Sequence, residues 1–116
     1  MKYFKAKEFT CDGVECFDKM QPTTLDMLDK ASELAKVPFT INSSFRTKEK
    51  NEAIKGAKNS AHLRGYAVDI KCNSSIDRFK IIEALLKAGY NRVGVASNFI
   101  HCDNDPSLAA GVIWLY

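Results

Sequence analysis

The chain has 116 residues, which suits one globular domain with a buried core and leaves little room for a second. Hydrophobic residues make up 46% of the chain and charged residues 27%, a composition that excludes disordered and fibrous proteins. The formal net charge is only +3, and the basic residues are scattered rather than interleaved with aromatic ones, so we expect no nucleic-acid partner. We expect one domain over residues 1–116, in a monomeric protein.

The first nine residues alternate charged and aromatic side chains and contain no apolar run. A secretory signal needs such a run, and a membrane-spanning helix needs a longer one. We therefore expect a chain made in the cytoplasm without a signal peptide, and no membrane span.

The first half of the chain predicts two helices and a strand. Leu25, Leu28 and Ala35 recur at helical spacing behind a threonine cap and an early proline, which is typical of an amphipathic helix. A β-branched run follows, and then a charged segment that ends near Gly56. The predicted elements are a helix over 22–36, a strand over 37–42 and a short helix over 47–55.

The second half predicts a helix between strands. Ser74 and Asp77 form a capping box, and Gly89 ends the helix that they begin. Residues 66–71 alternate strictly, which is typical of a strand, and Ser97-Asn98 is a tight turn between two further strands. The strands are expected over 66–71, 92–96, 99–103 and 111–116, and the apolar face of the helix at Phe79, Ile82, Leu85 and Leu86. These elements predict an α+β fold with a mostly antiparallel sheet and helices packed on one side.

Four cysteines are present, and only Cys11 and Cys16 are close in sequence. They flank a turn-like segment and can pair under oxidising conditions, so their redox state stays open. Cys72 and Cys102 are far apart, whereas a structural zinc site of four cysteines usually has two close pairs. We expect these two to be small buried apolar residues.

Both histidines of the chain lie near an aspartate in a strand-like segment. His101 and Asp103 project from the same face of their strand, because alternate residues share a face. Gly65 lets the backbone turn so that His62 can approach Asp69. From the residues alone, these groups are either hydrogen-bonded polar pairs or metal ligands. Two imidazoles and one carboxylate would form a zinc site with an open fourth position, as catalytic sites have.

Three motifs carry a resemblance to a known family. Ser60-x-His62-x-x-Gly65-x-Ala67-x-Asp69 resembles the signature of the zinc D-Ala-D-Ala carboxypeptidase and murein endopeptidase family. Phe99-Ile-His101-Cys-Asp103 is similar to the family's downstream His-x-Asp strand, and Ser43-Ser-Phe-Arg46 resembles its Ser-Gly-Tyr-Arg element. The opening segment Phe4-x-x-x-Glu8-Phe9-x-Cys11 resembles the small single-domain branch, so the likeness covers nearly the whole chain. The family includes vancomycin-resistance peptidases, phage endolysins and the related hedgehog domain, which implies a fold of that type.

The resemblance implies a Zn²⁺ cofactor with His62, Asp69 and His101 as metal ligands. It also implies that Arg46 holds a substrate carboxylate or steadies the oxyanion, a task that suits a guanidinium better than an ammonium group. Ser60 would hydrogen-bond near the substrate or support a ligand. The alternatives are a surface cation at Arg46 and a turn or cap residue at Ser60.

The general base is where this chain departs from part of the family. Several members carry Glu or Asp three residues before the last histidine, and this chain has Asn98 there. An amide cannot take a proton from the attacking water, so Asp103 is the candidate base. Asp103 can equally orient a ligand from behind.

The activity implied is that of a zinc metallopeptidase hydrolysing peptide bonds in bacterial peptidoglycan stem peptides, as a DD-carboxypeptidase or as an endopeptidase or endolysin. A non-catalytic zinc-binding module of the same fold is the alternative, as the hedgehog domain illustrates. A chain without a signal peptide that acts on the cell wall suits a phage or prophage lysis enzyme released by another route.

Overall fold

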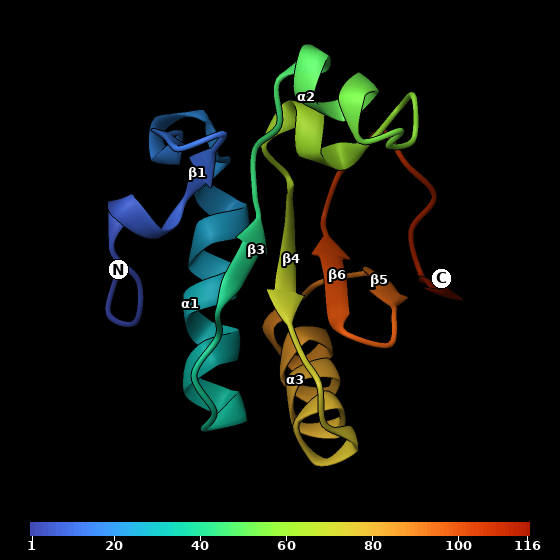
Figure 1. Ribbon diagram of the computed structural model, residues 1–116. Helices are drawn as coiled ribbons and strands as arrows, with labels where there is room; N and C mark the ends of the chain where they lie inside the picture. Colours follow the sequence, from blue (N-terminus) through green and yellow to red (C-terminus); the bar gives the residue numbers. More distant parts are fainter.

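The computed structural model describes residues 1–116 and contains a five-stranded sheet with two long helices against one face (Figure 1). The strand order is β3-β4-β6-β5-β7, and only the β5–β7 pair is parallel. The predicted α+β fold with a mostly antiparallel sheet is confirmed. The strands are β3 (Ile41–Ser43), β4 (Ala67–Lys71), β5 (Arg92–Val95), β6 (Phe99–Asp103) and β7 (Val112–Leu115). The helices are α1 (Pro22–Ala35), α2 (Lys48–Ala53) and α3 (Ser75–Ala88), and the 3₁₀ turns are η1 (Ala6–Glu8), η2 (Phe17–Lys19) and η3 (Ala61–Arg64).

The hydrophobic core lies between the sheet and the helices α1 and α3, which pack against each other. Val68 and Ile70 of β4 point into this core, so the residues between them point to the other face. Cys72 and Cys102 are buried in the core, as expected. The helices therefore leave one face of the sheet open, and that face carries Asp69. None of the helices has the length and apolar composition that a membrane crossing requires.

Helix α1 matches its prediction except at the cap. Gln21 is the N-cap and makes no side-chain cap hydrogen bond, and Pro22 takes the first helical position. Proline suits that position because its φ is already helical and no amide hydrogen is left unpaired. Thr24 is instead fully buried inside the helix, where its hydroxyl donates to Asn104 Oδ1 at 2.5 Å. The predicted threonine cap is therefore wrong.

Helix α3 begins and ends as predicted, with Ser74 Oγ accepting from the Asp77 amide at 3.0 Å and Gly89 in the left-handed region. Its predicted apolar face is confirmed at Leu85, which is fully buried, and in part at Ile82, which packs against the core, but it is wrong at the other two positions. Phe79 is 70% exposed and Leu86 is also exposed. The buried positions are Ile81, Ala84, Leu85 and Ala88. Small alanine side chains allow α3 to lie close to α1, so the face with the smaller residues is the one that packs.

Two predicted elements are each three residues shorter than expected. The strand predicted over 37–42 is β3, which begins only at Ile41 and ends at Ser43, while Lys36 ends α1 with a left-handed φ of 57°. The helix predicted over 47–55 is α2, which Thr47 caps by accepting from the Lys50 amide at 3.1 Å. The turn at 97–98 is confirmed, because the Ala96 amide donates to the Phe99 carbonyl across it.

An N-terminal hairpin precedes the main sheet and was not predicted. It consists of β1 (Thr10–Cys11) and β2 (Val14–Glu15), joined by Asp12-Gly13. Both turn residues have positive φ, which is the geometry that Asp-Gly favours in two-residue hairpins. Cys11 and Cys16 are free thiols in this arrangement, and Cys16 Sγ lies 3.5 Å from Ser44 Oγ.

Candidate metal centre

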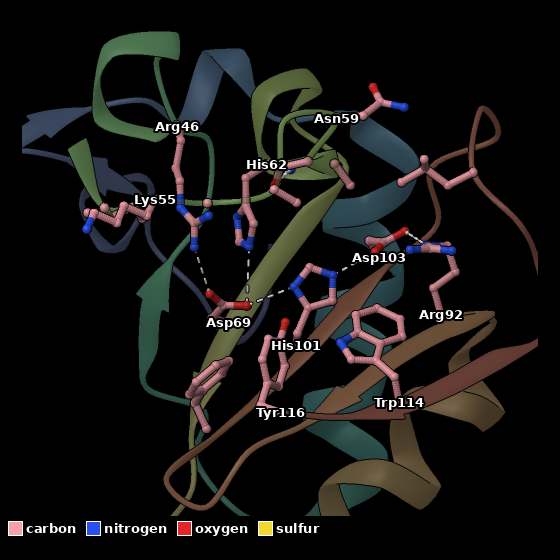
Figure 2. Close-up of a pocket in the computed structure, with 17 residues that line it drawn as sticks. Arg46, Lys55, Asn59, His62, Asp69, Arg92, His101, Asp103, Trp114 and Tyr116 are labelled. Atoms are coloured by element: carbon pink, nitrogen blue, oxygen red, sulfur yellow. Dashed lines mark hydrogen bonds and ion pairs between the residues drawn. The ribbon is translucent and has the colours of Figure 1, made fainter. Parts of the chain in front are cut away.

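Three side chains that are distant in sequence meet on the open face of the sheet (Figure 2). His62 comes from η3, Asp69 from β4 and His101 from β6, and all three are buried. Asp69 and His101 are direct cross-strand partners. Asp69 Oδ1 lies 3.2 Å from His62 Nε2 and 3.0 Å from His101 Nδ1. One ligand atom from each residue lies within 4.8 Å of the other two, which is a suitable spacing for a single ion.

The turn η3 brings His62 to the sheet. Ser60 Oγ caps η3 by accepting from the His62 amide at 3.2 Å, and Gly65 ends it with a φ of 77°. A β-carbon at Gly65 would collide with the backbone carbonyl of Lys19, so no other residue fits there without movement. Ser60 thus has the cap geometry and also lines the cavity beside the three residues.

Each histidine has one ring nitrogen held by an acceptor behind it. His62 Nδ1 donates to the Ser44 carbonyl oxygen at 2.6 Å, and its Nε2 faces Asp69 Oδ1. His101 Nε2 donates to Asp103 Oδ2 at 2.6 Å, and its Nδ1 also faces Asp69 Oδ1. Partners of this kind select the tautomer and fix the ring orientation of metal-binding histidines. Both rings therefore turn their other nitrogen toward one point.

Asp103 is 1% exposed, and both of its carboxylate oxygens are engaged. Oδ2 accepts from His101, while Oδ1 accepts from the Asp105 amide at 3.2 Å. Oδ1 also lies 2.9 Å from Arg92 Nε, an ion pair in which the Nε hydrogen is not aligned with any acceptor. Of the two roles that the sequence left open for Asp103, this geometry favours orienting His101 over accepting a proton from water.

Arg46 holds the side of Asp69 that faces away from the histidines. Its guanidinium donates to Asp69 Oδ2 at 3.1 Å, to Asn51 Oδ1 at 3.3 Å and to Ser43 Oγ at 3.1 Å. These three bonds fix the guanidinium, and through it they direct Asp69 Oδ1 toward His62 and His101. Arg46 also lines the cavity, so its predicted contact with substrate stays a prediction.

The electrostatics of the site favour an anionic Asp69. Burial alone would raise the pKa of Asp69, but hydrogen bonds from His101 and His62 outweigh it and hold the pKa well below its usual value. Burial disfavours the charge on His101, yet its hydrogen bonds to Asp103 and Asp69 raise its pKa. At neutral pH the site therefore offers a carboxylate to a cation.

The family comparison agrees with this geometry. The family model described as Peptidase M15 matches residues 2–103, most of the chain. The chain belongs to the peptidase M15 family. The resemblance inferred from its motifs is thereby confirmed, and the matched segment contains all three residues of the candidate metal centre. No curated protein matches the chain significantly.

A cavity of about 590 Å³ opens over the metal-site residues of this M15 peptidase. That volume lies in the range of small-molecule and peptide pockets. Its only carboxylates are Asp69 and Asp103, and Asn98 does not line it. Sequence reasoning assigned no role to several residues that do, among them Arg92, Trp114 and Tyr116. Arg92 lies opposite Asp103 across the β5–β6 pair. Trp114 and Tyr116 reach the cavity because β7 pairs in parallel with β5, and no local sequence pattern indicates that pairing.

Proposed function

We propose that this M15 peptidase is a zinc-dependent hydrolase of peptide bonds in bacterial peptidoglycan stem peptides. It would act either as a DD-carboxypeptidase or as an endopeptidase of the endolysin kind. The observation that carries the proposal is the convergence of His62 Nε2, Asp69 Oδ1 and His101 Nδ1 at the floor of a peptide-sized cavity.

The donor set fits zinc. Two neutral imidazole nitrogens and one carboxylate oxygen are typical of catalytic zinc sites, which keep a fourth position open for water or substrate. The outer partners of the three residues add support, because ligating histidines in proteins usually donate their second N–H to a carbonyl or carboxylate. Zinc held there would supply Lewis acidity toward a scissile carbonyl and activate a water for attack.

The protein's own residues prepare the cavity for an anionic peptide. Asp103 and the Ser44 carbonyl hold the two imidazoles, and Arg46 holds Asp69. Arg46, Lys55 and Arg92 line the cavity (Figure 2). Arg46 and Arg92 pair with Asp69 and Asp103, so Lys55 is the lining cation without an ion pair. Stem peptides carry carboxylates, which an unpaired ammonium group attracts.

We also propose that the protein acts at the cell wall, as a phage or prophage lysis enzyme. This part of the proposal rests on the family resemblance. Lysis of bacteria from outside by the purified protein, compared with the same protein in chelator, is its test.

The main experiment is mass spectrometry of purified muropeptides after incubation with zinc-loaded protein. We expect chelator-sensitive cleavage, and the mass lost identifies the bond. The variant Asp69→Ala should lose both bound zinc and activity. Full activity in that variant would contradict the proposal.

A non-catalytic zinc-binding module is the second candidate. It is favoured by one observation, namely that both carboxylates in the cavity are already engaged and neither is free to serve as a base. Intact muropeptides from a protein that holds equimolar zinc would support the module and contradict the peptidase.

A further inference from the structure

The wall of the cavity beside His101 is aromatic. The ring of Trp114 lies 5.2 Å from that of His101, and Tyr116 lies 6.2 Å from Trp114 and 5.0 Å from Phe99, all between centroids. Trp114 belongs to β7, and Tyr116 is the residue directly after the end of that strand. Both lie beyond residue 103, where the family match ends. The match therefore assigns them no role.

Gly94 explains how two large rings come so close to the metal-site residues. In β5 it lies between His101 of β6 and Trp114 of β7, its direct neighbours across the sheet. A β-carbon at Gly94 would lie 2.7 Å from ring atoms of both Trp114 and Tyr116. The two rings thus rest on bare backbone at this position, and any side chain there would displace them.

Tyr116 combines a seated ring with an accessible hydroxyl. The residue is 67% exposed, yet one edge of its ring is packed over Gly94 and against Phe99. In Figure 2 its hydroxyl points toward Asp69 and His101, and Arg46 approaches Asp69 from the other side. Burial raises the pKa of Tyr116 and outweighs a hydrogen bond from Trp114, which lowers it, so a phenol and not a phenolate faces the cavity.

A neutral donor at this position complements Arg46. All three nitrogens of the Arg46 guanidinium already donate hydrogen bonds, to Asp69, Asn51 and Ser43. A carbonyl oxygen that gains negative charge during hydrolysis is stabilised most by donors that are fixed in advance and cost no rearrangement. The hydroxyl of Tyr116, on a ring held by its aromatic neighbours, meets that requirement.

We propose that Tyr116 is a further substrate-contacting residue, whose hydroxyl donates a hydrogen bond to the carbonyl oxygen of the scissile peptide bond. Trp114 and Gly94 are its positioning residues. This inference rests on the proposed peptidase function and adds a donor to it from outside the segment that the family matches.

The test uses the full-length zinc-loaded protein and the variant Tyr116→Phe, which removes only the hydroxyl. We expect unchanged zinc stoichiometry, a kcat on muropeptides about a hundredfold lower, and a KM changed far less. A phosphinate peptide analogue, whose tetrahedral oxygens imitate the charged carbonyl oxygen, should bind the variant about a hundredfold more weakly as well. Tyr3→Phe is the matched control, because Tyr3 loses a hydroxyl that bonds only to Glu33 at the surface.

A second variant tests the geometry without touching the hydroxyl. Gly94→Ala should displace the rings of Trp114 and Tyr116 and thereby lower kcat and phosphinate affinity. It should also change the fluorescence of Trp114, the only tryptophan in the chain. Wild-type kcat and wild-type phosphinate affinity in Tyr116→Phe would overturn the inference and leave the zinc peptidase standing.

The two proposals fail in different ways. If the wild-type protein cleaves no muropeptide, the peptidase proposal fails, and phosphinate titration then decides the role of Tyr116 alone. Equal phosphinate affinity of the wild type and Tyr116→Phe, or no binding by the wild type, would overturn it. A hydroxyl-dependent difference in affinity would support it.

Discussion

Single residues behind His62, Asp69 and His101 determine the orientation of these three side chains. The Ser44 carbonyl accepts from His62 Nδ1, and Asp103 accepts from His101 Nε2. Arg46 donates to Asp69 Oδ2. Loss of such a partner typically weakens metal binding by 10–100-fold in other proteins, because the ligand is free to rotate away. Substitutions at these positions therefore separate orientation from chemistry.

Asp103→Asn is the most informative of these changes. The amide cannot accept as strongly from His101 Nε2, and it leaves the charge of Arg92 without its partner. We expect zinc affinity about 10–100-fold lower, measured by competition with a chromophoric chelator. With saturating zinc, the acidic limb of the pH–kcat profile should persist. Loss of that limb at unchanged zinc affinity would instead identify Asp103 as the general base.

The three candidate metal-binding residues were predictable because they lie in two short motifs with fixed spacing. His62 and Asp69 fall within one motif, and His101 is in the second. Trp114 and Tyr116 were not predictable, since only the parallel β5–β7 pairing carries them to the site. The ion pair of Asp103 was also not predictable from the sequence, because its partner Arg92 lies opposite it on β5 and not nearby in the chain.

At the scale of elements, helix α3 shows why apolar spacing alone does not identify a buried face. Two apolar stripes run along it, one through Phe79 and Leu86 and the other through Ile81 and Leu85. Both satisfy helical spacing, so the choice falls to the tertiary partner. Helix α1 packs against the stripe that contains alanines, because small side chains permit a closer approach.

This difference predicts a contrast between two truncations in α3. Leu85→Ala should cost about 2–5 kcal/mol of unfolding free energy, because it leaves a cavity in a fully buried position. Phe79→Ala should change stability by less than about 0.5 kcal/mol, since the ring is mostly in solvent. Urea denaturation followed by circular dichroism measures both. Similar costs for the two would contradict the packing described for α3.

The turn η3 gives a second prediction at this scale. Gly65→Ala places a β-carbon against the Lys19 carbonyl in a left-handed backbone, and we expect it to cost about 1–3 kcal/mol and to weaken zinc binding by displacing His62. Gly13→Ala is the matched control, because Gly13 has a similar positive φ and open space around it. The control should lose some stability and keep its zinc affinity. Thermal unfolding and zinc titration distinguish the two variants.

For the whole molecule, the site couples stability to pH and metal. In the chelator-treated protein the raised pKa of His101 contributes stability that is present below about pH 6.5, its usual value, and is lost as pH rises through the folded pKa. The lowered pKa of Asp69 contributes stability above about pH 4, and this is lost as pH falls through its folded value.

The metal-free protein should therefore be most stable between about pH 4 and pH 6.5 as far as these two groups are concerned. Zinc competes with the proton on His101, so the gain in Tm on adding zinc should increase from about pH 6 to pH 8. Differential scanning calorimetry with and without chelator measures both trends. A Tm of the metal-free protein that rises between about pH 6 and pH 8 would contradict the assignment for His101.

The pairing of Asp69 directly opposite His101 has one more consequence. A slip of β6 along β4 by one residue would turn the side chains of one strand toward the helices and separate the two ligands. Only a chain whose central strands are correctly aligned can then hold the ion tightly. Zinc binding would therefore stabilise only chains with the native register of β4 and β6, and chains with a shifted register would gain no stability from the ion.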